Sequence, residues 1–147
     1  MHLTLRVNER RLAVDVEPST MLLEVLREHA GLTGPRATCG VGLCGTCTVL
    51  LDGTPVSSCI LMAPLAADRE ITTVEGLAAD DPVVTRFDEH HAFQCGYCVP
   101  GMVLTATDMI ARGRAGDREE IRHGLGGNLC RCGCYSKIID AIEEAAR

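Results

Sequence analysis

The chain has 147 residues, of which 46% are hydrophobic and 3% aromatic, and its formal net charge is −6 at pH 7. This length fits one ordinary domain or two small ones, and an acidic chain without a cluster of Lys and Arg is not expected to bind nucleic acid. The sequence contains neither a run of about 18 apolar residues nor the apolar core of a signal peptide, so we expect no membrane span and a cytoplasmic location.

The first part of the chain predicts a small sheet. Apolar and polar residues alternate at 3–7 and again at 12–16, which predicts a β-hairpin turning at Asn8–Arg11. Further strands are predicted at 46–51 and 71–74. The strands enclose the first group of cysteines.

One helix is predicted between these strands. Its apolar face runs over 22–26, with Ser19 or Thr20 as its cap and Gly31 at its end. A mixed sheet packed on one helix is an α+β arrangement, and we expect it to form a first domain over residues 1–77.

From Leu77 onward the apolar residues recur at helical spacing, which predicts a second, helical domain over 78–147. The apolar positions within 102–110 predict one buried helical face. Asp117 and Ser136 are the predicted caps of two later helices.

The nine cysteines indicate metal binding, since a reducing compartment disfavours disulfides. The first group reads C-x4-C-x2-C-x11-C, and its glycine-rich opening is typical of a plant-type [2Fe-2S] site. Four thiolates also suit zinc, which is the alternative for both groups. The groups are Cys39, Cys44, Cys47 and Cys59, then Cys95, Cys98, Cys130, Cys132 and Cys134.

Two questions stay open from spacing alone. Cys130, Cys132 and Cys134 compete for two ligand positions, and the remaining cysteine is expected to be a small buried side chain. His90 and His91 precede Cys95 and raise a Rieske-type alternative, although enough thiolates are present without them.

Three motifs, TCGVGLCGTCTVLLDGTPVSSC, FQCGYCVPGM and GGNLCRCGCYSKI, resemble the iron–sulfur small subunit of the xanthine oxidase family of molybdenum hydroxylases. The resemblance covers essentially the whole chain. It implies a ferredoxin-like β-grasp domain followed by a four-helix domain, each with one [2Fe-2S] cluster. Val99 departs from a frequent threonine of the family, and Cys134 occupies a small-residue position, which favours a nonligand role.

The resemblance also implies partners and a path. A large subunit would hold molybdenum with a pterin, a medium subunit would hold FAD, and the complex would be a dimer of heterotrimers. Electrons would pass from molybdenum to the cluster of Cys95, Cys98, Cys130 and Cys132, then to that of Cys39, Cys44, Cys47 and Cys59, then to flavin. Gln94 and Cys132 would lie nearest the pterin.

The predicted function is therefore electron transfer within an oxidoreductase complex whose catalytic chemistry takes place on the molybdenum subunit. The substrate, an aldehyde, N-heterocycle, purine or carbon monoxide, cannot be read from this chain. A stand-alone ferredoxin with two clusters is the main alternative. A redox sensor is a weaker one, because no signalling segment is present.

Overall fold

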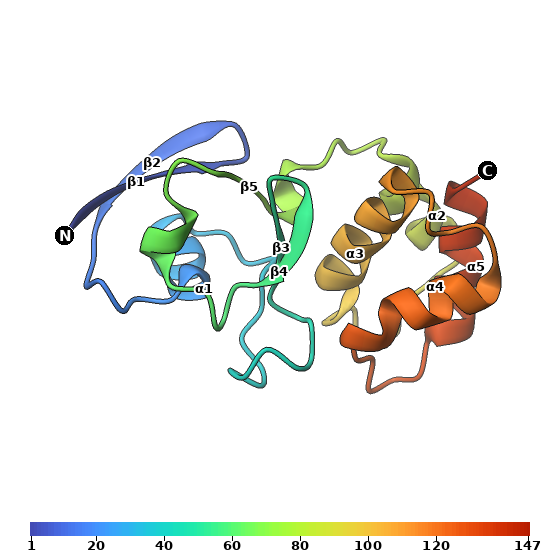
Figure 1. Cartoon of the computed structure of the whole chain (residues 1–147). Coiled ribbons are helices and arrows are strands. Elements are labelled where there is room, and N and C mark those ends of the chain that lie inside the picture. The colour runs from blue at the N-terminus through green and yellow to red at the C-terminus, as the bar shows by residue number, and fades with distance from the viewer.

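The computed structural model describes residues 1–147, and Figure 1 shows a sheet with a short helix at one end of the molecule and a group of helices at the other. The strands are β1 (His2–Val7), β2 (Arg10–Asp15), β3 (Thr48–Leu51), β4 (Thr54–Ser57) and β5 (Glu70–Thr72). The helices are α1 (Leu22–Glu24), α2 (Pro82–Glu89), α3 (Val99–Ala111), α4 (Arg118–Gly124) and α5 (Tyr135–Ala145). The predicted α+β class is confirmed.

The five strands form one mixed sheet in the order β2-β1-β5-β3-β4. Strand β1 is parallel to β5, and the other neighbours are antiparallel. The predicted first hairpin is present, but its turn is tighter than expected. Asn8 and Glu9 both have positive φ angles, 50° and 64°, as a two-residue turn with the twist of the strands requires, so β2 already begins at Arg10.

The predicted first helix is short, and its predicted caps are wrong. Met21 precedes α1 without a side-chain cap, while the carbonyl of Thr20 accepts a hydrogen bond from the Ala63 N–H. After α1 the helix widens into a π-helical turn, Val25–His29, because tertiary packing sets this segment more strongly than local capping. Gly31 ends the segment as predicted, with a φ of +67°.

Helix α3 is more buried than one apolar face predicts. It lies between strands β3 and β4 on one side and helices α2 and α4 on the other, so Gly101 through Ala106 are all buried. Asp117 caps α4 as predicted, since its side chain accepts the Glu120 N–H. The Ser136 cap is wrong, because α5 already begins at Tyr135 after Cys134.

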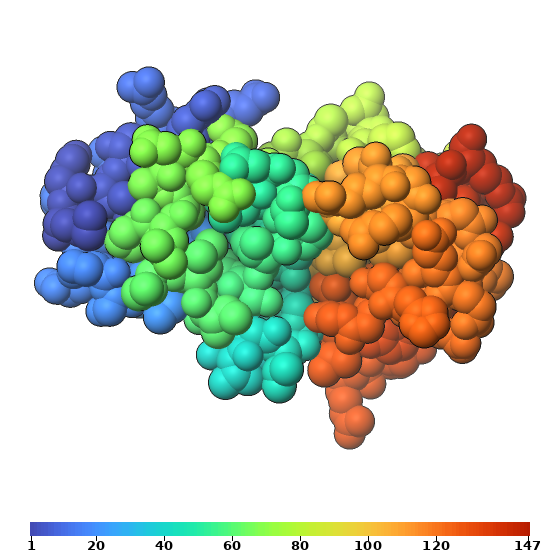
Figure 2. Space-filling view, in the orientation of Figure 1, coloured from blue at the N-terminus to red at the C-terminus, as the bar shows by residue number.

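Two hydrophobic cores lie on either side of the seam between sheet and helices. The first contains buried residues between Leu3 and Ile71, and the second contains buried residues between Val83 and Ile142. Figure 2 shows the corresponding parts of the surface in direct contact across the seam. No helix is long and apolar enough to cross a membrane.

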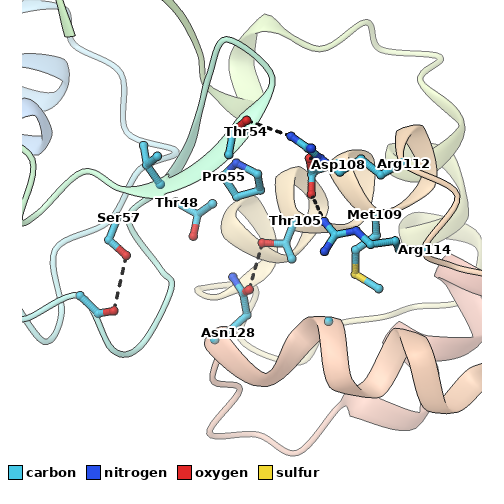
Figure 3. A pocket seen from close by; sticks show the side chains of 14 residues that line it. Thr48, Thr54, Pro55, Ser57, Thr105, Asp108, Met109, Arg112, Arg114 and Asn128 are labelled. Atoms are coloured by element: carbon cyan, nitrogen blue, oxygen red, sulfur yellow. Dashed lines mark hydrogen bonds and ion pairs between the residues drawn. The ribbon is translucent and has the colours of Figure 1, made fainter. Parts of the chain in front are cut away.

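A polar cavity of about 550 Å³ opens at this seam, between β4, α3 and the chain before the last cysteines. The buried carboxylate of Asp108 pairs with Arg112 and Arg114 there, and Arg112 also donates to Thr54 of β4 (Figure 3). Pairing of this kind is required of a charge that is only 4% exposed. The hydrogen bond from Arg112 to Thr54 therefore attaches the end of α3 to the sheet.

Glycines permit a very close approach at the seam. A Cβ at Gly101 would lie 2.2 Å from the Gly45 carbonyl oxygen, and a Cβ at Gly45 would lie 2.3 Å from the Gly127 carbonyl oxygen. Backbone contact at this distance excludes any side chain. The chain around Gly45, next to Cys44, is consequently held directly against the start of α3.

We expect Gly101→Ala to destabilise the protein by about 1–3 kcal/mol, the usual cost of forcing extra atoms into a packed site. Thermal unfolding of the purified chain measures the effect. Gly126→Ala is the matched control, because a Cβ there meets nothing within 4 Å. Equal stability of Gly101→Ala and the parent would show that the Gly45 backbone can move away from a Cβ at residue 101 at little cost in stability.

Candidate metal centres

The first centre is formed by the loop between α1 and β3 together with Cys59 after β4. Cys44 and Cys47 are buried, and Cys39 and Cys59 are part-exposed. The loop curls back on Cys39, whose Sγ accepts N–H bonds from Leu43 at 3.4 Å and from Cys44 at 3.5 Å. The left-handed glycines that permit this curl are Gly40, Gly42 and Gly45, with φ angles of +67°, +75° and +74°.

The four sulfurs of this centre form two pairs. Cys39 interacts with Cys44, and Cys59 interacts with Cys47. Backbone N–H groups, that of Val41 first, lower the pKa of Cys39 to about 6, whereas burial and the neighbouring Cys47 raise the pKa of Cys59 to about 11. The pair that contains Cys39 therefore holds the more stable thiolate, which is the form that binds metal.

The second centre joins two segments that are far apart in sequence. Cys95 and Cys98 lie on the turn that leads into α3, and Cys130 and Cys132 lie on the loop before α5. The Tyr97 N–H donates to the Cys95 Sγ at 3.5 Å. The sulfurs again form two pairs, Cys95 with Cys132 and Cys98 with Cys130.

The electrostatics of the second centre resemble those of the first. Burial and the adjacent Cys130 raise the pKa of Cys98 to about 12, whereas the Tyr97 N–H lowers the pKa of Cys95. Burial opposes ionisation of Cys130, but N–H groups of the 132–134 turn and the Cys98 thiol hold its pKa below the ordinary value. Each centre therefore combines a thiol whose pKa is lowered by backbone N–H groups with a thiol whose pKa is raised by burial and a neighbouring cysteine.

This donor set fits a [2Fe-2S] cluster. All nine cysteines are free thiols, and the two centres each bring four together as two pairs. A binuclear cluster takes two protein ligands on each iron, so it needs pairs and not a single convergence point. Accordingly, no three Cys, His, Asp or Glu side chains are close enough together to hold one ion.

A backbone hydrogen bond connects the two centres. The Leu129 N–H, one residue before Cys130, donates to the carbonyl oxygen of Cys44 at 2.9 Å. Beside it the buried amide of Asn128 donates to the Gly45 carbonyl and accepts from Thr105. The contact lies in the glycine-packed seam, where the Gly45 and Gly127 backbones approach each other closely.

The other predicted site residues lie around the second centre. Gln94 is exposed and directly precedes Cys95. Cys134 lies beside Cys130 and just before α5. It is partly exposed, so the prediction of a buried leftover cysteine is wrong, and Cys130 and Cys132 are not buried either. His90 pairs with Glu144 of α5 at 2.5 Å, and the ring of His91 packs edge-on against Phe93. The two histidines have structural partners in the helical half.

Sequence reasoning missed three residues that join the centres. Arg36 and Tyr97 contact each other across the seam, and Leu129 makes the hydrogen bond to Cys44. The position of Tyr97 between Cys95 and Cys98 was the one available signal. Arg36 and Leu129 carry no motif, since their roles depend on contacts with the opposite half.

The sheet part and the helical part each contain one four-thiol centre. This arrangement is typical of proteins with two [2Fe-2S]-binding domains. Two family models match accordingly, a 2Fe-2S iron-sulfur cluster binding domain over residues 5–78 and a [2Fe-2S] binding domain over residues 73–143. The chain belongs to the family of iron–sulfur small subunits of the molybdenum hydroxylases.

Two relatives illustrate this membership. The small FeS subunit of nicotinate dehydrogenase from Eubacterium barkeri is 41% identical, over 97% of this chain and 93% of its own length. The iron-sulfur-binding subunit of aldehyde oxidoreductase from Escherichia coli is 37% identical, over 99% of this chain and 72% of its own. The chain thus spans most of each relative.

Solved structures agree with the fold. A chain of quinoline 2-oxidoreductase from Pseudomonas putida 86 superimposes with a TM-score of 0.94 at 42% identity, covering 99% of this chain and 92% of that chain. The aldehyde oxidoreductase from Desulfovibrio desulfuricans gives a TM-score of 0.91 at 37% identity, with 99% of this chain but 17% of that chain covered. In that enzyme the matched region is part of a much longer polypeptide.

Proposed function

We propose that this chain is the electron-transfer subunit of a multi-subunit molybdenum hydroxylase. It would relay single electrons from a molybdenum-pterin centre on a large partner, through its two [2Fe-2S] clusters, to FAD on a medium partner. The observation that carries the proposal is the pair of four-thiol centres, joined by the hydrogen bond from the Leu129 N–H to the Cys44 carbonyl. Two centres in such direct contact suit a relay.

The proposed ligands of the first cluster are Cys39 and Cys44 on one iron and Cys47 and Cys59 on the other. The pairing of their sulfurs and the N–H groups aimed at Cys39 support this assignment. When bound, the cluster accepts and releases one electron. The surrounding N–H groups favour the more negative reduced state.

The proposed ligands of the second cluster are Cys95 with Cys132 and Cys98 with Cys130. Cys134 is left out, because its sulfur lies against Cys130, which already has Cys98 as its pair. Cys134 instead occupies the position before α5. It is a neighbour of the cluster and not a ligand.

The proposed direction runs from the second cluster to the first. Gln94 and Cys132 would face the pterin of the large subunit, which the exposure of Gln94 beside Cys95 allows. The first centre would face flavin. The finer architecture, a β-grasp domain over 1–77 and a four-helix domain over 78–147, is proposed together with assembly as a dimer of heterotrimers in the cytoplasm, where free cysteines persist.

Relatives named as subunits support the existence of partners. A 6-hydroxypseudooxynicotine dehydrogenase subunit from Paenarthrobacter nicotinovorans is 40% identical, and a caffeine dehydrogenase subunit from a Pseudomonas species is 37% identical. The names of the relatives cover different substrates. We infer that the substrate is selected by the large partner and not by this chain.

Metal analysis and purification from the native source test the proposal. We expect about four irons per chain, in two spectroscopically distinct [2Fe-2S] centres after reduction with dithionite. We also expect two larger subunits, one with molybdenum and one with FAD, to co-purify. Zinc or a single cluster would contradict the relay, and a monomer with both clusters but no partners would favour the stand-alone ferredoxin.

A further inference from the structure

Arg36 of the sheet half binds the cysteine turn of the helical half. Its Nη1 donates to the carbonyl oxygens of Gly96 and Tyr97, both at 2.8 Å. Both carbonyls belong to the turn between Cys95 and Cys98. The guanidinium of the sheet half is therefore hydrogen-bonded to the turn of the helical half that carries Cys95 and Cys98.

Residues of both halves hold Arg36 in position. The Arg36 backbone N–H donates to the Thr46 carbonyl at 3.0 Å, and the hydroxyl of the buried Thr46 donates back to the Arg36 carbonyl. Opposite it, the guanidinium lies 4.9 Å from the centre of the Tyr97 ring, whose hydroxyl donates to the Ala37 carbonyl. Arg36 is fixed in place, unlike an ordinary exposed arginine.

The decisive feature is the peptide group between Gly96 and Tyr97. Its carbonyl oxygen accepts from Arg36 at 2.8 Å, and its N–H donates to the Cys95 Sγ at 3.5 Å. Hydrogen bonds in series polarise one another, and a charged donor at the start of the series strengthens the bonds after it. The positive charge of Arg36 thus polarises the Gly96–Tyr97 peptide group and strengthens its N–H hydrogen bond to the Cys95 sulfur.

We propose that Arg36 sets the reduction potential of the second cluster through the Gly96–Tyr97 peptide. This inference rests on the proposed function, because it takes Cys95 as a cluster ligand. N–H donation to a ligand sulfur stabilises the extra negative charge of the reduced state and raises the potential. Arg36 would accordingly raise the potential of the second cluster more than that of the first, and one half of the chain would tune the other.

A redox titration of the purified full chain, followed by electron paramagnetic resonance, tests the inference. Arg36→Met removes the charge and both hydrogen bonds, and we expect it to lower the potential of the second cluster selectively. Arg27→Met is the matched control. Its guanidinium also donates to two backbone carbonyls, those of Thr33 and Pro35, without touching the second centre.

Tyr97→Phe separates tuning from mere attachment of the two halves. It removes the hydroxyl bond to Ala37 but keeps the ring under Arg36 and the Gly96–Tyr97 peptide. We expect both potentials to stay at their parent values. The magnetic coupling between the two reduced clusters reports their separation, and it should stay unchanged in Arg36→Met if the seam stays closed.

Three results would overturn the inference: an unchanged second potential in Arg36→Met, an equal shift of both clusters, or an equal shift in Arg27→Met. If Arg36→Met assembles no clusters, Arg36→Gln decides by the same criterion, since its neutral amide can still donate to a carbonyl. A parent chain that lacks two [2Fe-2S] signals would contradict the proposed function. Two signals with unaltered potentials would contradict this inference alone.

Discussion

Cys132→Ser is expected to remove the second [2Fe-2S] cluster and leave the first. The Cys132 sulfur pairs with that of Cys95, so its loss leaves one iron with a single thiolate. The two centres share no cysteine, and the first centre keeps all four. The variant should lose about two irons per chain and one of the two paramagnetic signals of the reduced protein.

Cys134→Ala is the matched control, placed two residues further along the same loop. Its thiol lies beside Cys130 and just before α5, and we propose no ligand role for it. We expect full iron content and both signals. Loss of the second cluster in Cys134→Ala, with retention in Cys132→Ser, would exchange the two assignments.

Leu129→Pro is expected to slow electron transfer between the two clusters several-fold. The substitution removes the N–H that donates to the Cys44 carbonyl at 2.9 Å. Electronic coupling decays less along covalent and hydrogen bonds than across a van der Waals gap, and this bond is the contact that joins the backbone of Cys44 to the residue before Cys130. Asn128 is extended, with φ −124° and ψ 109°, close to the conformation that a residue before proline adopts.

Leu129→Ala is the control, because it keeps the N–H and truncates a side chain that is 56% exposed. Pulsed one-electron reduction of the full chain gives the rate at which the electron equilibrates between clusters. Both variants should retain both clusters. Equal rates in Leu129→Pro and Leu129→Ala would show that electrons cross elsewhere, for example through the Arg36–Tyr97 contact.

Local sequence signals predicted much of the fold because those elements are determined by residues that are close together in the sequence. The hairpin of β1 and β2 follows from alternation, and the Asp117 cap follows from its side-chain chemistry. The Ser19, Thr20 and Ser136 caps failed for a common reason. Packing of α1 and α5 decides where those helices begin, and propensity is a weak prior against it.

For the cysteine centres too, the sequence predicted local features and missed those that depend on tertiary contacts. Cysteine spacing predicted which short segments carry the sulfurs, but the second centre combines two segments that are far apart in sequence. Spacing does not choose between Cys132 and Cys134, and the proposed choice of Cys132 rests on its contact with Cys95 of the other segment. Likewise, Arg36 and Leu129 act through backbone groups of the opposite half, and such contacts leave no pattern in the side-chain sequence.

Helix α3 limits how far the two halves can be exchanged between relatives. Each half matches its own family model, which invites treating them as interchangeable modules. However, α3 packs on β3 and β4 as well as on α2 and α4, and Gly101 meets the Gly45 backbone directly. A chimera that takes its two halves from different relatives would keep both cysteine loops, but it would not preserve the close fit of α3 against β3, β4 and the Gly45 backbone.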